Sequence, residues 1–143
     1  MRQTLGKKER IKSRKLISRI FAEGMVFQKY PLRALVLFSP FTVLKADDTI
    51  EARIAAGFTV STRNFKKAVD RNRIKRLMKE VFRKSRVHLL QVTQQKHTKM
   101  EIFFIYTGKE MPGYLQVEQA YSGLEKKLLE HLGTMKQEDT NTI

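Results

Sequence analysis

The segment Arg71-Asn72-Arg73-Ile74-Lys75-Arg76 holds the densest group of chemically capable side chains in this sequence. Arginine guanidinium groups bind phosphate oxygens through two parallel hydrogen bonds, and a lysine ammonium adds a compact positive charge. An asparagine amide both donates and accepts hydrogen bonds, which suits a sugar or a base edge. This combination of residue types and spacing predicts a site that binds a phosphate-rich polymer.

No constellation of catalytic or metal-binding residues accompanies that segment. The 143-residue chain has no cysteine, which excludes a thiolate nucleophile and a thiolate metal site. It also lacks a glycine-rich phosphate loop and a nucleophile elbow. The histidines lack the spacing of metal ligands and the acidic cluster falls in an expected loop: His88, His97 and His131, and Asp47, Asp48 and Glu51. We predict no catalytic residue and no metal ligand in this chain.

Positive charge is concentrated in two segments. The chain has 29 Lys and Arg against 14 Asp and Glu, which gives a net charge of +15. Residues 1–24 carry net +6 and residues 63–86 carry net +9, whereas the rest is nearly neutral. Compensating acids at helical spacing are missing, and like charges four residues apart destabilise a helix. We therefore expect both segments to build one anion-binding wall beside an open sheet surface, in preference to ordinary solvated helix faces.

The hydrophobic residues suffice for one folded core but not for a membrane segment. They make up 41% of the chain, and no apolar run approaches the roughly 18 residues that a membrane span needs. The N-terminus also lacks the apolar stretch of a secretory signal. We expect a cytoplasmic protein with no membrane partner and no obligate protein partner.

The apolar pattern predicts a single α+β domain over residues 1–132 and a disordered tail over 133–143. The expected elements are helix, three strands, helix, strand and helix, over residues 13–24, 26–30, 32–38, 53–60, 69–86, 102–107 and 115–132. Residues 87–99 are polar and predict a loop or a fraying helix end. This order is typical of a two-layer α/β sandwich.

The first helix and the third strand carry the features that matter for a site. Ser13 and Gly24 suit the two ends of the helix, whose apolar stripe is Leu16, Ile17, Ile20 and Phe21. The strand alternates between two faces: Ile54, Ala56, Phe58 and Val60 on one, and Arg53, Ala55, Gly57 and Thr59 on the other. Because the second face is small and polar, we expect it to stay open to a ligand. Phe65 does not fit the following helix and is expected to anchor the loop before it.

Residues 58–83, FTVSTRNFKKAVDRNRIKRLMKEVFR, resemble the signature of the bacterial ribonuclease P protein component. The stretches RIKSRKLISRIFAEG and YPLRALVLF are similar to the same family, so the resemblance covers about residues 7–132. It implies a ribosomal-protein-like α/β sandwich with a left-handed βαβ crossover through the arginine-rich helix. Physical rules alone would favour a right-handed crossover.

The resemblance also implies a function. A family member binds ribonuclease P RNA and the 5′ leader of precursor tRNA, and supports the endonucleolytic removal of that leader. The reaction and its Mg²⁺ ions belong mainly to the RNA subunit. The leader lies in a cleft between the first helix and the sheet.

Position by position, the resemblance and the charge pattern give two sets of expected site residues. The RNA-binding set is Arg71, Asn72, Arg73, Lys75, Arg76, Arg63, Lys66, Lys67, Lys12 and Arg14. The leader-binding set is Ile17, Phe21, Ser61, Ala55 and Gly57. Ile17 stands where many members have phenylalanine, which leaves an apolar contact without stacking. Phe38, Phe58 and Tyr106 are further rings that either stack on RNA or belong to the core. The connection 39–52 and the tail receive no role.

Three other functions are compatible with a basic chain of this kind. One is a ribosomal or ribosome-assembly protein, which binds RNA without an associated reaction. A second is a DNA-binding protein that places residues 70–86 in the major groove, although no helix-turn-helix is recognisable. A third is a nuclease that acts without RNA. Stimulation of cleavage by a partner RNA at low Mg²⁺ separates the first from ribonuclease P.

Overall fold

The computed structural model describes residues 11, 13–40 and 54–134. Its elements are α1 (Arg14–Glu23), β1 (Met25–Lys29), β2 (Leu32–Pro40), β3 (Ile54–Val60), α2 (Ala68–Ser85), α3 (Val87–Gln95), β4 (Thr98–Tyr106) and α4 (Tyr114–Thr134). The predicted order of elements holds, with α3 added between α2 and β4. Lys12, residues 41–53 and the tail from residue 135 lie outside the described residues, so the expectations for them stay predictions.

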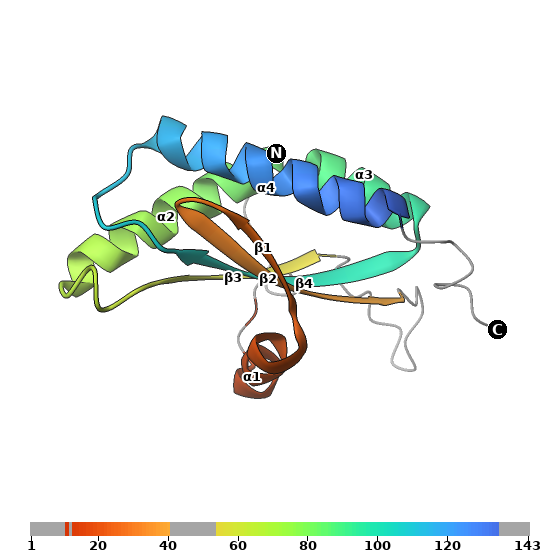
Figure 1. The fold of residues 1–143 in the computed structure, drawn as a ribbon, viewed down its shortest axis with the longest axis horizontal. Coiled ribbons are helices and arrows are strands. Elements are labelled where there is room, and N and C mark those ends of the chain that lie inside the picture. The colour runs from red at the N-terminus through yellow and green to blue at the C-terminus, as the bar shows by residue number, and fades with distance from the viewer. Residues whose placement is uncertain (1–10, 12, 41–53, 135–143) are drawn as a thin grey trace.

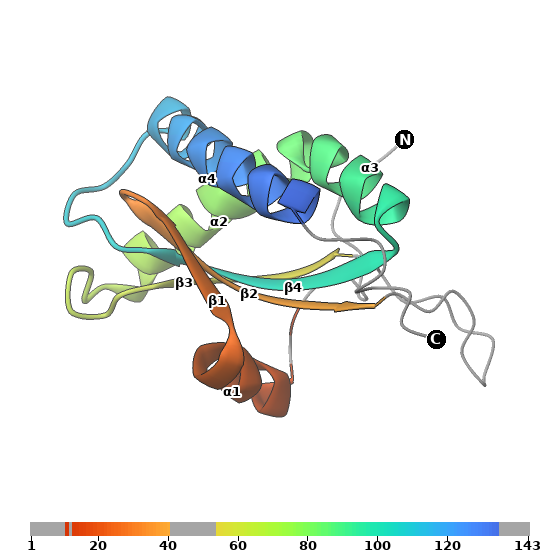
Figure 2. The same ribbon diagram turned by 45° about the vertical axis from the view of Figure 1, so that its right-hand side comes forward.

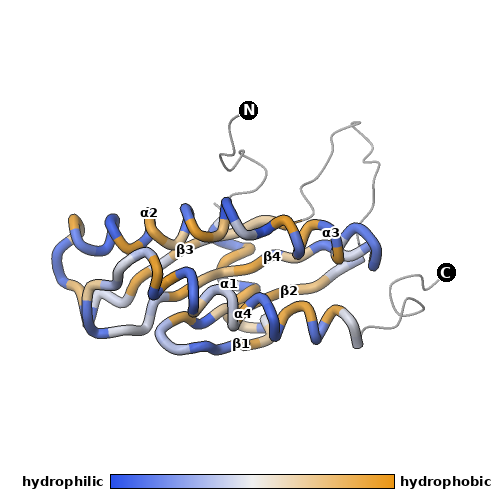
Figure 3. The backbone as a smooth tube through the Cα atoms, turned by 90° about the horizontal axis from the view of Figure 1, so that it is seen from above, coloured by the Kyte–Doolittle hydropathy of each residue, from blue (hydrophilic) through white to orange (hydrophobic). Residues whose placement is uncertain are grey.

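Four strands form one sheet in the order β1-β2-β4-β3. Neighbours pair antiparallel except for β3 and β4, which are parallel. The chain therefore crosses from β3 to β4 through α2 and α3. With the helical layer toward the viewer, as in Figure 3, this crossover is left-handed. The handedness that the family resemblance implies is thus confirmed.

Helices cover the two faces of the sheet unequally. Figure 1 shows α2, α3 and α4 together on one face and α1 alone on the other. The main core lies under the three helices, and there β3 contributes Ile54, Ala56, Phe58 and Val60, the face that the alternation predicts. A smaller core of Ile20, Leu35 and Phe103 lies under α1. Two separate apolar clusters therefore fix the helices to the sheet.

α1 begins and ends close to the predicted residues. The Ser13 hydroxyl accepts a hydrogen bond from the Leu16 N–H at 3.3 Å, as expected of a helix cap. Gly24 has an ordinary φ of −67°, so it is not needed for a left-handed turn. A Cβ there would lie 2.4 Å from the carbonyl oxygen of Ile20. Close packing, and not backbone conformation, accounts for this glycine.

A separate helix, α3, replaces the loop or fraying helix end that was expected over residues 87–99. Only Leu89 and Thr93, one helical turn apart, are buried in this helix. The Thr93 hydroxyl donates to the carbonyl oxygen of Leu89 at 2.8 Å, which satisfies that polar group inside the core. Leu90 and Val92 are half-buried against the same core, and the three glutamines of the helix make the segment read as polar in the sequence. β4 likewise begins at Thr98, before the predicted start at residue 102.

Candidate nucleic-acid interface

The N-terminal half of α2 presents part of the predicted RNA-binding segment to solvent. Ile74 is fully buried and fixes this half of the helix against the core. The exposed members of the segment are Asn72, Arg73 and Arg76, and the half-buried members are Arg71 and Lys75. Val69, which does not fit the buried stripe, is 77% exposed. This half of α2 therefore offers two guanidinium groups and one amide to a ligand.

Arg71 is engaged with the loop that precedes α2. Its Nη1 donates hydrogen bonds to the carbonyl oxygens of Phe65 and Lys66, each at 2.8 Å. The side chain thus turns back from the first turn of the helix onto the loop. The sequence does not distinguish this arginine from Arg73, but the structure does.

The loop of residues 61–67 is anchored to β4 as well as to α2. Asn64 Nδ2 donates to the carbonyl oxygen of Gly108 at 3.2 Å. The buried Phe65 ring lies with its centroid 6.0 Å from that of Tyr106, which confirms the predicted anchor. Ser61 is half-buried, and its hydroxyl accepts a hydrogen bond from the Arg63 N–H at 3.2 Å. The exposed cations of this loop are Arg63, Lys66 and Lys67.

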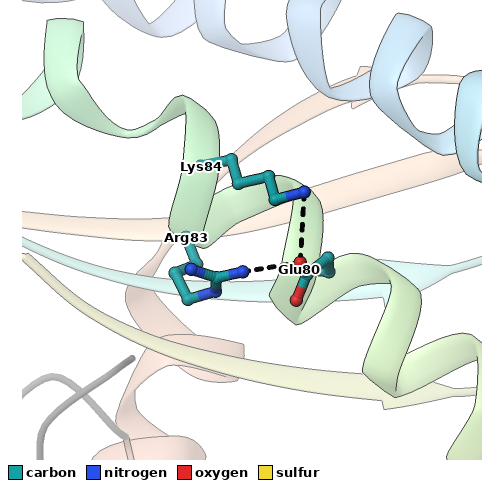
Figure 4. Close-up of polar contacts among 3 residues, drawn as sticks. All are labelled: Glu80, Arg83 and Lys84. Carbon is teal, nitrogen blue, oxygen red and sulfur yellow. Dashed lines mark hydrogen bonds and ion pairs between the residues drawn. The ribbon is translucent and has the colours of Figure 1, made fainter. Parts of the chain in front are cut away.

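The C-terminal half of α2 carries cations that are paired. Glu80 Oε1 accepts a hydrogen bond from Arg83 at 2.5 Å and lies 3.3 Å from Lys84 Nζ (Figure 4). The hydrogen bond from Arg83, with that from Lys84 and the charges of both, lowers the pKa of Glu80. On α1, Glu23 pairs with Arg19 in the same way at 3.3 Å. The expectation that compensating acids are missing is therefore wrong at these positions.

α1 carries an exposed aromatic ring beside the sheet. Phe21 follows the fully buried Ile20 by about 100° around the helix, so its ring lies at the side of α1 and is 52% exposed. The ring packs against Phe103 in a T-shaped arrangement with centroids 5.5 Å apart. Ile17 is half-buried against the same small core, and Arg14 is exposed. Phe21 is therefore supported on one side and open on the other.

The face of β3 that was expected to be open is closed at two of the predicted leader-binding residues. Ala55 and Gly57 are both buried. A Cβ on Gly57 would lie 2.5 Å from the Phe103 ring and 3.5 Å from Ile11 Cβ. The Ile11 N–H also donates to the carbonyl oxygen of Ala56 at 3.0 Å, so Ile11 lies beside this strand. The small residues make room for a ring of the protein itself.

The accessible part of this sheet face lies further along the strands. Arg33 on β2, Ile105 on β4 and Thr59 on β3 are adjacent in register, and we call them the sheet strip. Arg33 is exposed and the other two are half-buried. Sequence analysis missed Arg33 and Ile105, because nothing in one sequence shows that β4 inserts between β2 and β3.

The described cations of the two basic segments do not form one wall. α1 packs on β2 and β4 at one face, whereas α2 packs on β3 and α4 at the other. Figure 2 shows the sheet lying between α1 and α2. For the described residues, the expectation of a single anion-binding wall is therefore wrong, because their cations form two surfaces. We call them the α2 surface (Arg63, Lys66, Lys67, Asn72, Arg73 and Arg76) and the α1 surface (Arg14, Ile17, Phe21 and the sheet strip).

Most of the candidate stacking rings belong to the core. Phe58 stacks on Phe104 with centroids 5.5 Å apart, Phe38 packs against the main core, and Tyr106 is buried with its hydroxyl donating to the Glu110 carbonyl oxygen at 2.7 Å. Burial raises the pKa of Tyr106. Apart from Phe21, the large exposed ring in the described part of the chain is Tyr30, which is 65% exposed in the β1–β2 turn. Its exposure could not be foreseen without the pairing of these strands.

The described residues hold neither a grouped metal-binding site nor a membrane-spanning helix. Within residues 11, 13–40 and 54–134, no three His, Asp or Glu side chains are grouped so that they could hold a metal ion. Asp47, Asp48 and Glu51 lie outside these ranges. None of the described helices is both long enough and apolar enough to cross a membrane.

The fold defines a class, that of small basic α+β proteins with a left-handed β3–α2–β4 crossover, and comparison with known proteins narrows it. The family model of ribonuclease P matches residues 5–130. The ribonuclease P protein component of Porphyromonas gingivalis is 31% identical over 134 residues, which cover 92% of this chain and 88% of the relative. The chain belongs to the ribonuclease P protein family, whose members are subunits of an endoribonuclease that processes tRNA.

Solved structures share the fold at lower sequence identity. The ribonuclease P protein of Staphylococcus aureus, solved at 2.0 Å, matches with a TM-score of 0.57 and 20% identity. The match covers 84% of this chain and 94% of the S. aureus chain. A second structure of the S. aureus protein gives a TM-score of 0.56 at 22% identity, covering 86% and 91% of the two chains. The fold class predicted from the sequence is confirmed.

Proposed function

We propose that this chain binds ribonuclease P RNA through its α2 surface and the 5′ leader of precursor tRNA through its α1 surface. The RNA subunit would then cut the leader at the mature 5′ end. The observation that carries the proposal is the separation of the two surfaces by the sheet. A protein with two surfaces on opposite sides can contact a large RNA and a single strand at the same time, which a single wall could not do without competition.

The α2 surface suits a folded RNA. Its arginines bind phosphate oxygens in a fixed fork, and the Asn72 amide can bind a 2′-hydroxyl or a base edge. The half-buried Lys75 adds charge beside them. Phosphate contacts release counterions, so this binding weakens steeply as salt rises. The paired cations at Arg83 and Lys84 contribute less, because their charge is partly neutralised by Glu80.

The α1 surface suits a single strand. Stacking of a base on an aromatic ring is worth about 1–3 kcal/mol and tolerates any sequence. Phe21 supplies the ring, Ile17 an apolar contact, and Arg33 and Arg14 supply charge for the backbone. Ala55 and Gly57 act here only indirectly, by seating the Phe103 ring that supports Phe21.

Mg²⁺ is assigned to the RNA subunit. Among the described residues, no three His, Asp or Glu side chains are grouped so that they could hold a metal ion. The contribution of the protein is to neutralise phosphates, which lowers the concentration of Mg²⁺ that the RNA needs in order to fold and bind substrate. The partners implied are ribonuclease P RNA, which would carry out the reaction, and precursor tRNA, which is its substrate.

Reconstitution with a ribonuclease P RNA and a 5′-extended tRNA tests this function. Adding the protein at low Mg²⁺ should stimulate release of the leader, and protein without RNA should release none. Binding of the RNA without any stimulation would favour a structural RNA-binding protein. Equal affinity for duplex DNA and folded RNA at matched salt would favour a DNA-binding protein. Cleavage of the precursor by the protein alone would favour a nuclease that acts without RNA.

A further inference from the structure

We propose that Arg71 is a positioning residue, which holds the loop of residues 61–67 in its RNA-binding form and does not itself contact RNA. The identity of the RNA partner rests on the proposed function. The hold on the loop is a property of the free protein and can be tested without RNA. The inference separates two arginines, Arg71 and Arg73, that are equivalent in the sequence.

The geometry of Arg71 carries the first step. Its Nη1 has two hydrogens, and two carbonyl oxygens, those of Phe65 and Lys66, each lie 2.8 Å from it. Distances of this kind are typical of hydrogen bonds from a charged donor. Both hydrogens of this nitrogen are used within the protein, so the guanidinium group is held against the loop, and only its Nε and Nη2 hydrogens remain for another acceptor. Arg71 is also half-buried, whereas Arg73 is exposed.

These hydrogen bonds hold the end of the loop that leads into α2. Phe65 and Lys66 lie at the end of the loop that enters α2, and the carbonyls that Arg71 binds belong to consecutive peptide groups. Asn64 holds the middle of the same loop by its bond to the Gly108 carbonyl. Lys67, at the N-cap of α2, makes no capping bond with its side chain. The Arg71 guanidinium therefore supplies side-chain hydrogen bonds that tie this end of the loop to the helix.

The third step is the consequence for binding. The loop presents the exposed side chains of Arg63, Lys66 and Lys67. If the backbone that carries them is already fixed, the RNA does not have to order it, and affinity rises. Loss of Arg71 should therefore weaken binding without removing a phosphate contact. Loss of Arg73 should remove a contact and leave the loop unchanged.

Hydrogen exchange of the free protein tests directly whether Arg71 holds the loop of residues 61–67. The reporter is the Phe65 amide, which donates to the Ser61 carbonyl oxygen at 3.2 Å inside the loop. We expect about tenfold faster exchange in Arg71→Met and no change in Arg73→Met, the matched control on the same helix. Asn64→Ala should also speed exchange. Arg71→Lys, which does not span both carbonyls, serves as the second variant if Arg71→Met does not fold by thermal melting, and unchanged exchange at Phe65 in folded Arg71→Lys would count against the proposal in the same way. Unchanged exchange at Phe65 in folded Arg71→Met overturns the proposal.

Binding to ribonuclease P RNA at several salt concentrations supplies the second measurement. We expect Arg71→Met and Asn64→Ala to weaken affinity about tenfold while the slope of log affinity against log salt stays at the wild-type value. Arg73→Met should reduce that slope by about 0.7–0.9. Arg71→Lys should not restore affinity, because an ammonium on a shorter chain does not span both carbonyls.

Two results would overturn the proposal in this second measurement. One is a slope reduced in Arg71→Met as much as in Arg73→Met, which would make Arg71 a phosphate contact. The other is full recovery of affinity in Arg71→Lys, which would make charge alone sufficient. If the wild-type protein binds no RNA, the proposed function fails, and the exchange measurement still decides whether Arg71 holds the loop.

Discussion

The Phe103 ring lies over Gly57, so near that a Cβ on Gly57 would stand 2.5 Å from two ring carbons. The two residues are paired in register on the parallel strands β4 and β3. The same ring packs against Phe21 from α1 in a T-shaped arrangement. A glycine that looks like an opening for RNA in the sequence is therefore the seat of a ring that supports the helix.

Gly57→Ala should destabilise the protein by about 1–3 kcal/mol, the usual cost of overpacking. The Phe103 ring cannot move away freely, because α1 packs against it. The measurement is the free energy of unfolding in denaturant. Gly113→Ala is the matched control, since a Cβ there meets nothing within 4 Å. A Gly57→Ala protein as stable as this control would show that the ring gives way.

Arg73→Ala should weaken assembly with ribonuclease P RNA and reduce the salt slope by about one unit per lost phosphate contact. Lys84→Ala should change the slope less, because Lys84 is paired with Glu80. The measurement is the affinity for the RNA at several salt concentrations. Equal slopes for wild type and Arg73→Ala would remove Arg73 from the interface.

The elements that the sequence predicts well are those with strong apolar periodicity. The stripe of α2 through Ile74, Met78 and Phe82 and the buried residues of α4 appear as expected. α3 was missed because only Leu89 and Thr93 are buried in it, while Leu90 and Val92 are half-buried against the core. The apolar pattern along the chain identifies a helix or strand when enough of its residues are buried, and α3 has too few buried residues for that.

The arrangement of the site was less predictable than its residues. The exposed cations of α2 lie where the motif suggests, but no pattern along the chain reveals that α1 and α2 take opposite faces. That fact depends on the left-handed crossover and on β4 lying between β2 and β3. For the same reason Arg33, which only the strand register places beside Thr59 and Ile105, could not be foreseen.

Glu80→Gln should lower stability at neutral pH and have little effect in acid. The hydrogen bonds from Arg83 and Lys84 lower the pKa of Glu80 from the ordinary value of 4.5. A carboxylate whose pKa is depressed on folding stabilises the protein above its unfolded pKa, and the contribution is lost as pH falls through the folded pKa. The measurement is the difference in unfolding free energy between wild type and variant from pH 7 to pH 3. A difference that stays constant across this range would contradict the pairing.

Arg33→Ala should weaken binding of the 5′ leader and leave binding of the RNA subunit unchanged. Arg33 lies on the α1 surface, across the sheet from Arg73, so assembly with the RNA subunit should keep its affinity and its salt slope. The affinity of the assembled enzyme for leader-containing tRNA should fall, with a slope reduced by about 0.7, the value for one contact to a single strand. Equal effects of Arg33→Ala and Arg73→Ala on RNA assembly would show that the two surfaces are not separate.

Phe21→Ala should weaken binding of leader-containing tRNA more than that of leaderless tRNA. Loss of one stacked base costs about 1–3 kcal/mol, which is roughly five- to 150-fold in affinity. The variant should remain folded, because the ring is half exposed. Ile20→Ala is the matched control: this neighbour is fully buried, so its loss should cost about 2–5 kcal/mol of stability. Any loss of affinity in Ile20→Ala should be the same for both substrates. Equal losses for the two substrates in Phe21→Ala would instead make Phe21 a packing residue of α1, and the leader would have to lie elsewhere.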